Sequence, residues 1–168
     1  MSAGYEIERR WLVRARPGLR EELEGGWRLR QGYVRAEEPA VRIRSGEPRG
    51  PVLTCKAGRG VRRREAETVV SPEMAELLFE AAGDRVLEKV RFRIGPWELD
   101  WFDGDLEGLV LLELELEEER DPVPDPPPGL ELLHEVTDHN SLVSAAMAAM
   151  TSGERRALVR RVYAEAAE

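Results

Sequence analysis

Charged and apolar side chains alternate residue by residue in segment after segment of this chain. Glu6, Glu8 and Arg10 occupy alternate positions. Apolar Ile7 lies between the two glutamates, and Trp11 follows Arg10. Successive side chains of a β-strand point to opposite faces, so this spacing predicts a strand with one charged and one apolar face. The same pattern recurs along most of the sequence, which predicts a mainly β protein whose strands each bury one face.

Eight segments carry this period-2 pattern. The predicted strands are residues 5–13, 27–35, 40–46, 51–57, 62–70, 85–94, 97–103 and 109–118. Two arrangements fit them. An open sheet would pack its apolar face on helices and leave its charged face in water. Alternatively, eight strands would close into a barrel with the charges inside, which removes exposed edges and encloses a lumen able to hold one small ligand.

A barrel with an apolar outer face needs helices to cover it, and the sequence supplies candidates. Ser71 followed by Pro72 predicts the start of a helix, and Gly83 ends the apolar run that follows. Two further helices are predicted over residues 139–151 and 154–166. Together with the strands they make an α+β fold.

The single cysteine and the tryptophans lie on the apolar faces of the predicted strands. We expect Trp27, Trp97 and Trp101 to pack in the core rather than stack on a nucleobase. The single cysteine, Cys55, cannot form an internal disulfide, and we expect it to be a buried, inert thiol.

Composition narrows the classes of function. The formal net charge of −8 argues against general nucleic-acid binding, which requires a basic surface. The chain has no apolar run long enough to cross a membrane and does not open with a signal-peptide pattern. We therefore expect a cytoplasmic protein with neither nucleic acid nor membrane as its partner.

The two signs of charge lie on separate predicted strands. The basic set is Arg42, Arg44, Lys56, Lys89 and Arg91, and the acidic set is Glu6, Glu8, Glu65, Glu67, Asp100, Glu113 and Glu115. Buried charges must be paired, metal-bound or hydrated, so a lumen lined this way implies a polar guest. The basic strands suit a polyanion, and the acidic strands can meet phosphate through a hard cation such as Mg²⁺ or Mn²⁺. Phosphoryl transfer uses this combination.

Eight short motifs occur in the order found in one known superfamily. They are Glu6-x-Glu8-x-Arg10, Leu29-Arg30-Gln31-Gly32-Tyr33, Val41-Arg42-Ile43-Arg44, Thr54-Cys55-Lys56, Arg64-Glu65-Ala66-Glu67, Glu88-Lys89-Val90-Arg91, Glu98-Leu99-Asp100 and Leu112-Glu113-Leu114-Glu115. With them, residues 6–138 resemble the CYTH superfamily, the triphosphate tunnel metalloenzymes, and most closely its short bacterial inorganic tripolyphosphatase-like members. The resemblance implies a closed eight-stranded antiparallel β-barrel, or tunnel. Residues 1–151 would form the tunnel domain and residues 152–168 an appended C-terminal helix.

The resemblance also implies an activity and a set of residues for it. The activity is metal-dependent hydrolysis of inorganic tripolyphosphate or a small organic triphosphate, with Mg²⁺ or Mn²⁺ as cofactor. The implied substrate-binding residues are Arg10, Arg42, Arg44, Lys56, Lys89 and Arg91. The implied metal ligands are Glu6, Glu8, Asp100, Glu113 and Glu115. Glu8, Glu67 and Asp100 would serve a second metal or orient the attacking water, with Arg10 beside the triphosphate as the fourth catalytic residue.

Two positions depart from the superfamily pattern. Arg10 stands where the signature has a lysine, which keeps the charge but removes a proton donor or acceptor near neutral pH. After Val136 and Thr137, the tyrosine and basic residue of the superfamily's plug helix are missing. A replacement cation would have to come from the last helix, which carries Arg155, Arg156, Arg160 and Arg161. The simpler interpretation of these four arginines is a solvated helix face.

Three alternatives to a triphosphatase remain open at this point. One is a cyclase that converts ATP to cyclic AMP, although no base-stacking aromatic residue lies on a charged face. Another is a module that binds polyphosphate or nucleotide without turnover. The third is a barrel whose charges form purely structural ion pairs. We expect a small-molecule triphosphate as the partner, and the sequence leaves open a homodimer.

Overall fold

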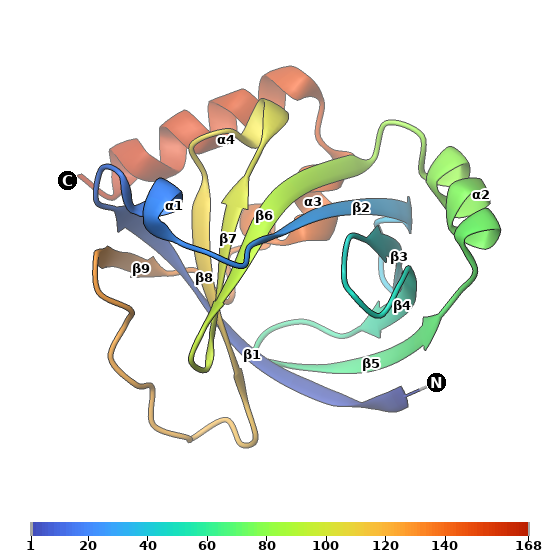
Figure 1. The fold of residues 1–168 in the computed structure, drawn as a ribbon, viewed down its shortest axis with the longest axis horizontal. Coiled ribbons are helices and arrows are strands. Elements are labelled where there is room, and N and C mark those ends of the chain that lie inside the picture. Colours follow the sequence, from blue (N-terminus) through green and yellow to red (C-terminus); the bar gives the residue numbers. More distant parts are fainter. Residues whose placement is uncertain (1, 168) are drawn as a thin grey trace.

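The computed structural model of the protein describes residues 2–167 and is shown in Figure 1. Within this range the chain forms nine strands, four α-helices and two short 3₁₀ helices. In chain order they are β1 (Ser2–Ala15), α1 (Leu19–Glu22), β2 (Trp27–Arg35), β3 (Ala40–Ser45), β4 (Val52–Ala57), β5 (Arg62–Val69), α2 (Pro72–Ala82), β6 (Val86–Ile94), β7 (Trp97–Phe102), η1 (Gly104–Leu106), β8 (Val110–Leu116), β9 (Leu130–Glu135), η2 (Asn140–Leu142), α3 (Ser144–Ala149) and α4 (Ser152–Glu165).

Eight of the strands formed by residues 2–167 close into an antiparallel barrel (Figure 1), which confirms the closed arrangement over the open sheet. The strands follow the order β5-β4-β3-β2-β6-β7-β8-β1, and β1 pairs back onto β5. Ile7, in the middle of β1, pairs with Arg62 of β5 on one side and Leu116 of β8 on the other. The predicted strands match the observed ones to within three residues at every end.

A ninth strand, β9, was not predicted. Strand β5 pairs with β1 only as far as Ile7, and β9 pairs with the same edge of β1 further along. Trp11 and Leu12 thus pair with β8 on one side and with β9 on the other. Its sequence, LELLHE, has leucines on both faces, so its alternation is weaker than that of the barrel strands. One of these leucines, Leu132, packs on an outer apolar cluster, whereas Leu133 packs on the cluster that fills one end of the barrel.

The inward face of the barrel changes from charged to apolar along the strands. On β1 the inward residues Glu6, Glu8 and Arg10 are followed by Leu12, and on β7 Asp100 is followed by Phe102. Leu12 and Phe102 belong to a buried cluster that also holds Leu142 of η2, Met147 of α3, and Leu158 and Val162 of α4. The barrel is therefore charged in one part and closed by an apolar core with helices in the other.

The outer face of the barrel is covered only in part. Helix α2 packs Ala75 and Phe79 against Ile43 of β3. A second cluster on the outside of β6, β7 and β8 holds Trp97 and Trp101 and is covered by Leu19, Val123 and Leu130. Trp97 and Trp101 are thus core residues as predicted, while Trp27 is half-buried. We expected helices alone to cover the barrel. Part of the cover comes instead from the extended connector over residues 121–129, and part comes from the short helix α1, which was not predicted.

The prediction of a buried Cys55 is wrong. The Cys55 side chain is exposed on the outside of β4, next to exposed Ala66 of β5. Helix α2 packs mainly against the neighbouring strands β2 and β3. The alternation identified the correct face of the strand, but it did not show whether that face would be covered.

The C-terminal helices differ from their predicted lengths. Instead of one helix over 139–151, the chain forms η2 and the six-residue α3, separated by Val143 in an extended conformation. Helix α4 starts at Ser152 because Thr151 and Glu154 form a capping box, in which each side chain bonds the other residue's backbone N–H. None of the helices in the described range is both long and apolar enough to cross a membrane.

Candidate functional site

The charged part of the barrel surrounds a cavity of about 1330 Å³. Among residues 2–167, ten cationic and ten acidic side chains line it, although the whole chain carries a net charge of −8. Every site residue predicted from the sequence lines this cavity except Asp100. The barrel thus brings charged side chains from seven of its eight strands into one lumen.

One wall of the lumen is cationic and only partly neutralised. Arg44 of β3 pairs with Glu47 at 2.6 Å, while Arg42 lies 3.9 Å from Glu67 and donates to the Thr54 hydroxyl at 3.2 Å. Burial, together with nearby Arg42, lowers the pKa of Arg44 to about 10. The buried Nε–H groups of both arginines have no hydrogen-bond partner among residues 2–167. This wall therefore presents cationic donors that suit an anion.

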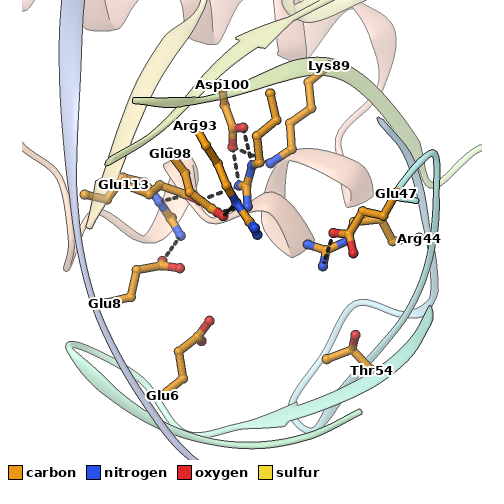
Figure 2. Close-up of polar contacts among 12 residues, drawn as sticks. Glu6, Glu8, Arg44, Glu47, Thr54, Lys89, Arg93, Glu98, Asp100 and Glu113 are labelled. Carbon is orange, nitrogen blue, oxygen red and sulfur yellow. Dashed lines mark hydrogen bonds and ion pairs between the residues drawn. The ribbon is translucent and has the colours of Figure 1, made fainter. Parts of the chain in front are cut away.

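The opposite side of the lumen is acidic (Figure 2). Glu6 and Glu8 of β1 are bridged by Arg63, whose Nη2 lies 2.9 Å from Glu6 and 3.0 Å from Glu8. Lys56 adds contacts of 2.8 Å to Glu6 and to Glu65. Burial acts to raise the pKa of Glu6, but Lys56 and Arg63 outweigh it and hold that pKa below its usual range.

Two acids on this side are less well neutralised. Burial, reinforced by Glu6, raises the pKa of Glu115, which lies directly across from Glu8 in the β1–β8 pairing. Burial also raises the pKa of Glu65, despite the nearby Lys56 ammonium. An excess of negative charge therefore remains around Glu6, Glu8 and Glu115, where an added cation would be stabilised.

The deepest charges form a continuous network. Arg91 donates to both oxygens of Asp100 at 2.6 Å and to Glu113 at 2.6 Å, and Lys89 also donates to Asp100. Asp100 is fully buried, and Figure 2 shows it beside Lys89 at the top of the lumen. Burial and Arg91 together lower the pKa of Lys89 to about 8. Asp100 thus holds Lys89 and Arg91 at the cavity surface without reaching it.

Comparison with known proteins places this lumen in a family. No family model matches the chain. The chain is 31% identical over 122 residues to an inorganic triphosphatase of Acetivibrio thermocellus, covering 69% of this chain and 77% of that protein. It is 32% identical over 151 residues to an inorganic triphosphatase of Nitrosomonas europaea, covering 85% of this chain and 96% of that protein. The chain belongs to the inorganic triphosphatase family.

The fold agrees with this family. The crystal structure of the inorganic triphosphatase NE1496 superposes with a TM-score of 0.58 at 29% identity, covering 87% of this chain and 95% of that one. A Bacillus halodurans structure with a TM-score of 0.55 and 18% identity shows the shared fold alone. The closed barrel that the resemblance implied is therefore the barrel of the inorganic triphosphatase family.

The lumen also contains charged residues that we did not predict from the sequence. Arg63 lines the cavity and is largely buried, whereas Arg64, which was assigned to the motif with Glu65 and Glu67, is exposed on the outside. The strand alternation could have identified Arg63 as a lumen residue, because it lies two residues before Glu65 and therefore on the same face of β5. Arg49 and Glu47 come from the loop after β3, where no strand pattern reveals orientation.

The arginines of α4 do not supply a cation to the lumen. Arg155 is buried, but its guanidinium donates to four backbone carbonyls, of Asp84, Val86, Met147 and Ala148. Arg156 pairs with Asp105, and the side chains of Arg160 and Arg161 are exposed. The lumen is instead bounded on this side by small, uncharged side chains of α3, including Ser144, Ala146 and Ala149.

The residues of the acidic side match the donor chemistry of a hard divalent cation. Carboxylate oxygens are the ligands that Mg²⁺ and Mn²⁺ prefer, and Glu6, Glu8 and Glu115 provide them on adjacent strands. Within residues 2–167, no group of three acidic, histidine or cysteine side chains is already arranged to hold a metal. Arg63 pairs with Glu6 and Glu8, and Lys56 pairs with Glu6, so a cation at these two carboxylates would require the ion pairs to rearrange.

Proposed function

We propose that this protein is a divalent-metal-dependent triphosphatase of the CYTH superfamily that hydrolyses inorganic triphosphate. The observation that carries the proposal is the division of the lumen into an under-neutralised cationic wall and an under-neutralised acidic side. A linear polyanion with a divalent cation satisfies both sides at once. The names of the two relatives support inorganic triphosphate as the substrate.

Arg42, Arg44 and Arg91 are the proposed triphosphate ligands. The unpartnered Nε–H groups of Arg42 and Arg44 provide donors for phosphate oxygens, which arginine binds through a planar fork. Lys89 adds charge beside Arg91 at the cavity surface. Asp100 acts in this proposal by holding these two cations, rather than by contacting metal or water as the family resemblance implied.

Lys56 and Arg63 have a double role in the proposal. They now neutralise Glu6 and Glu8, and an arriving triphosphate offers them a stronger anionic partner. As they turn to phosphate, the Glu6 and Glu8 carboxylates become available to a cation. Triphosphate and metal would then each favour the binding of the other.

Glu6, Glu8, Glu113 and Glu115 are the proposed metal ligands. When bound, Mg²⁺ or Mn²⁺ supplies charge neutralisation on the phosphate oxygens and orients a water. Glu8 is the proposed acceptor of a hydrogen bond from that water. Arg49 and Thr54 hold Glu67 on the opposite wall, and its pKa of about 2, lowered by Arg49 against the effect of burial, keeps it ionised next to Arg42.

A phosphate-release panel tests this proposal. Tripolyphosphate, pyrophosphate, ATP and thiamine triphosphate are each incubated with the protein in Mg²⁺, in Mn²⁺ and in excess chelator. We expect fast release from tripolyphosphate with metal and none in chelator. Tight tripolyphosphate binding without release would favour a binding module, and cyclic AMP from ATP would favour a cyclase. Full turnover in chelator would contradict the metal mechanism.

A further inference from the structure

Arg10 lies where the charged part of the lumen meets the apolar part. On β1 it follows Glu8 and precedes Leu12, and all three point into the barrel. The Arg10 side chain is almost fully buried. Burial acts to lower its pKa, but Glu113 and Glu8 outweigh this effect and raise it, so the guanidinium stays charged.

The three nitrogens of the Arg10 guanidinium each bind a different part of the protein. Nε donates to Glu113 of β8 at 2.8 Å, and Nη2 donates to Glu8 at 2.6 Å. Nη1 donates to the backbone carbonyl of Leu142 at 3.1 Å. The first two contacts reach proposed metal ligands, and the third reaches the segment that leads into α3.

The backbone of residue 10 holds the same segment. Its N–H donates to the Thr137 hydroxyl at 3.0 Å, and its carbonyl accepts from the N–H of Val136 at 2.7 Å. Leu142 is fully buried in the apolar cluster with Met147 of α3. Residues 136–142 therefore leave β9, pass over Arg10 and enter the short helix that bounds the lumen.

Lysine cannot reproduce this arrangement. An arginine presents five N–H donors in a rigid planar fork, whereas a lysine ammonium is a single point with three donors. The carboxylates of Glu8 and Glu113 and the Leu142 carbonyl lie around separate nitrogens of the fork. A lysine at this position would keep the charge and still lose part of the three-way contact.

We propose that Arg10 is a positioning residue that couples the α3 segment closing the lumen to the carboxylates of Glu8 and Glu113. Movement of α3 away from the barrel then disturbs two proposed metal ligands, and binding of a cation to those ligands steadies α3. The part of this inference that concerns metal rests on the proposed function. The link between Arg10 and the mobility of α3 does not.

The test compares Arg10→Lys with Arg9→Lys. Arg9 is the neighbouring residue, points to the other face of β1 and pairs with Glu135, so it is a matched control. Hydrogen exchange is followed in residues 140–150, and Mn²⁺ affinity is measured by calorimetry. In Arg10→Lys we expect exchange in this segment to accelerate and Mn²⁺ affinity to fall, each by at least about fivefold, the lower end of typical coupling between sites. Arg9→Lys should change neither.

Two further measurements make the comparison decisive. Saturating Mn²⁺ should slow exchange of residues 140–150 in the parent protein and do so less in Arg10→Lys, because coupling is reciprocal. Glu8→Gln weakens the hydrogen bond between Arg10 and Glu8, and it should also accelerate exchange in residues 140–150. This variant tests the coupling if Arg10→Lys does not fold. Parental exchange in both variants, or faster exchange with unchanged Mn²⁺ affinity, overturns the coupling. A parent protein that neither binds Mn²⁺ nor hydrolyses tripolyphosphate overturns the proposed function, while the exchange comparison still decides whether Arg10 holds α3.

Discussion

Single arginines that line the lumen differ in how fully neighbouring carboxylates neutralise them. Arg44 has one carboxylate partner and a lowered pKa, whereas Arg91 is surrounded by Asp100, Glu98 and Glu113. The less neutralised group has more electrostatic free energy to gain from an anion. We therefore expect Arg44 to contribute strongly to triphosphate affinity.

Arg44→Ala should weaken binding of tripolyphosphate to the metal-loaded protein by about 30-fold or more, corresponding to roughly 2 kcal/mol. Calorimetry with Mg²⁺ present measures this change. Arg64→Ala is the matched control, because Arg64 is exposed on the outside of β5 and its removal changes the net charge equally. Equal weakening in both variants would show a long-range charge effect instead of a lumen contact.

Asp100 offers a second prediction at this scale. Asp100→Asn leaves Lys89 and Arg91 buried with one fewer negative charge, which should destabilise the fold by about 3 kcal/mol. Urea unfolding of this variant and of Asp125→Asn, at an exposed position, measures the difference. Parental stability combined with lost metal binding would instead make Asp100 a metal ligand, as the family resemblance implied.

At the scale of elements, strand alternation predicted the strands and the face on which each residue lies, while the resemblance to a known superfamily favoured the closed barrel over an open sheet. Alternation placed Glu6, Glu8 and Arg10 on one face of β1, which the structure shows to be the lumen face, because parity depends only on local backbone geometry. It could not show that Asp100 lies behind Lys89 and Arg91, or that Cys55 is uncovered, because both depend on distant packing. Arg49 in the loop after β3 and the short length of α3 were not predicted for the same reason.

Helix α4 is attached to the barrel by one phenol group as well as by apolar contacts. The Tyr163 hydroxyl donates to the Val13 carbonyl at 2.9 Å and accepts from the Val110 N–H at 3.1 Å. Tyr163→Phe should therefore lower the free energy of unfolding by about 1–2 kcal/mol. Tyr5→Phe, at an exposed tyrosine, is the control in urea unfolding. Equal stability of the two variants would mean that α4 is held by its apolar face alone.

At the scale of the whole molecule, buried carboxylates link stability to pH. Burial acts to raise the pKa values of Glu6, Glu67 and Glu113, but neighbouring cations hold all three below their usual range, with Glu67 at about 2. Folded-state values below the unfolded-state value mean that the unfolded chain takes up protons first as pH falls. These groups therefore stabilise the fold above about pH 4.3, the ordinary glutamate pKa, and lose this contribution below it.

Urea unfolding at pH 7, 5, 4 and 3 should show constant stability at first and a progressive loss below about pH 4.3. The raised pKa values of Glu65 and Glu115 act in the opposite sense and should soften the loss without reversing it. In Glu67→Gln, stability at pH 7 should be lower and its decline between pH 4 and pH 3 shallower. A fold equally stable at pH 7 and pH 3 would contradict the ion pairing described for the lumen.

The central claim is that the lumen hydrolyses triphosphate by bringing metal-bound carboxylates and phosphate-bound cations together. Phosphate release from tripolyphosphate with Mg²⁺, compared between the parent protein and Glu113→Gln, tests it most directly. Glu113 lies between Arg10 and Arg91, and its amide analogue keeps the shape and removes the charge. We predict rapid release by the parent and at least about a hundredfold loss in the folded variant. A folded variant that releases phosphate at the parental rate, or a parent that releases none, would contradict it.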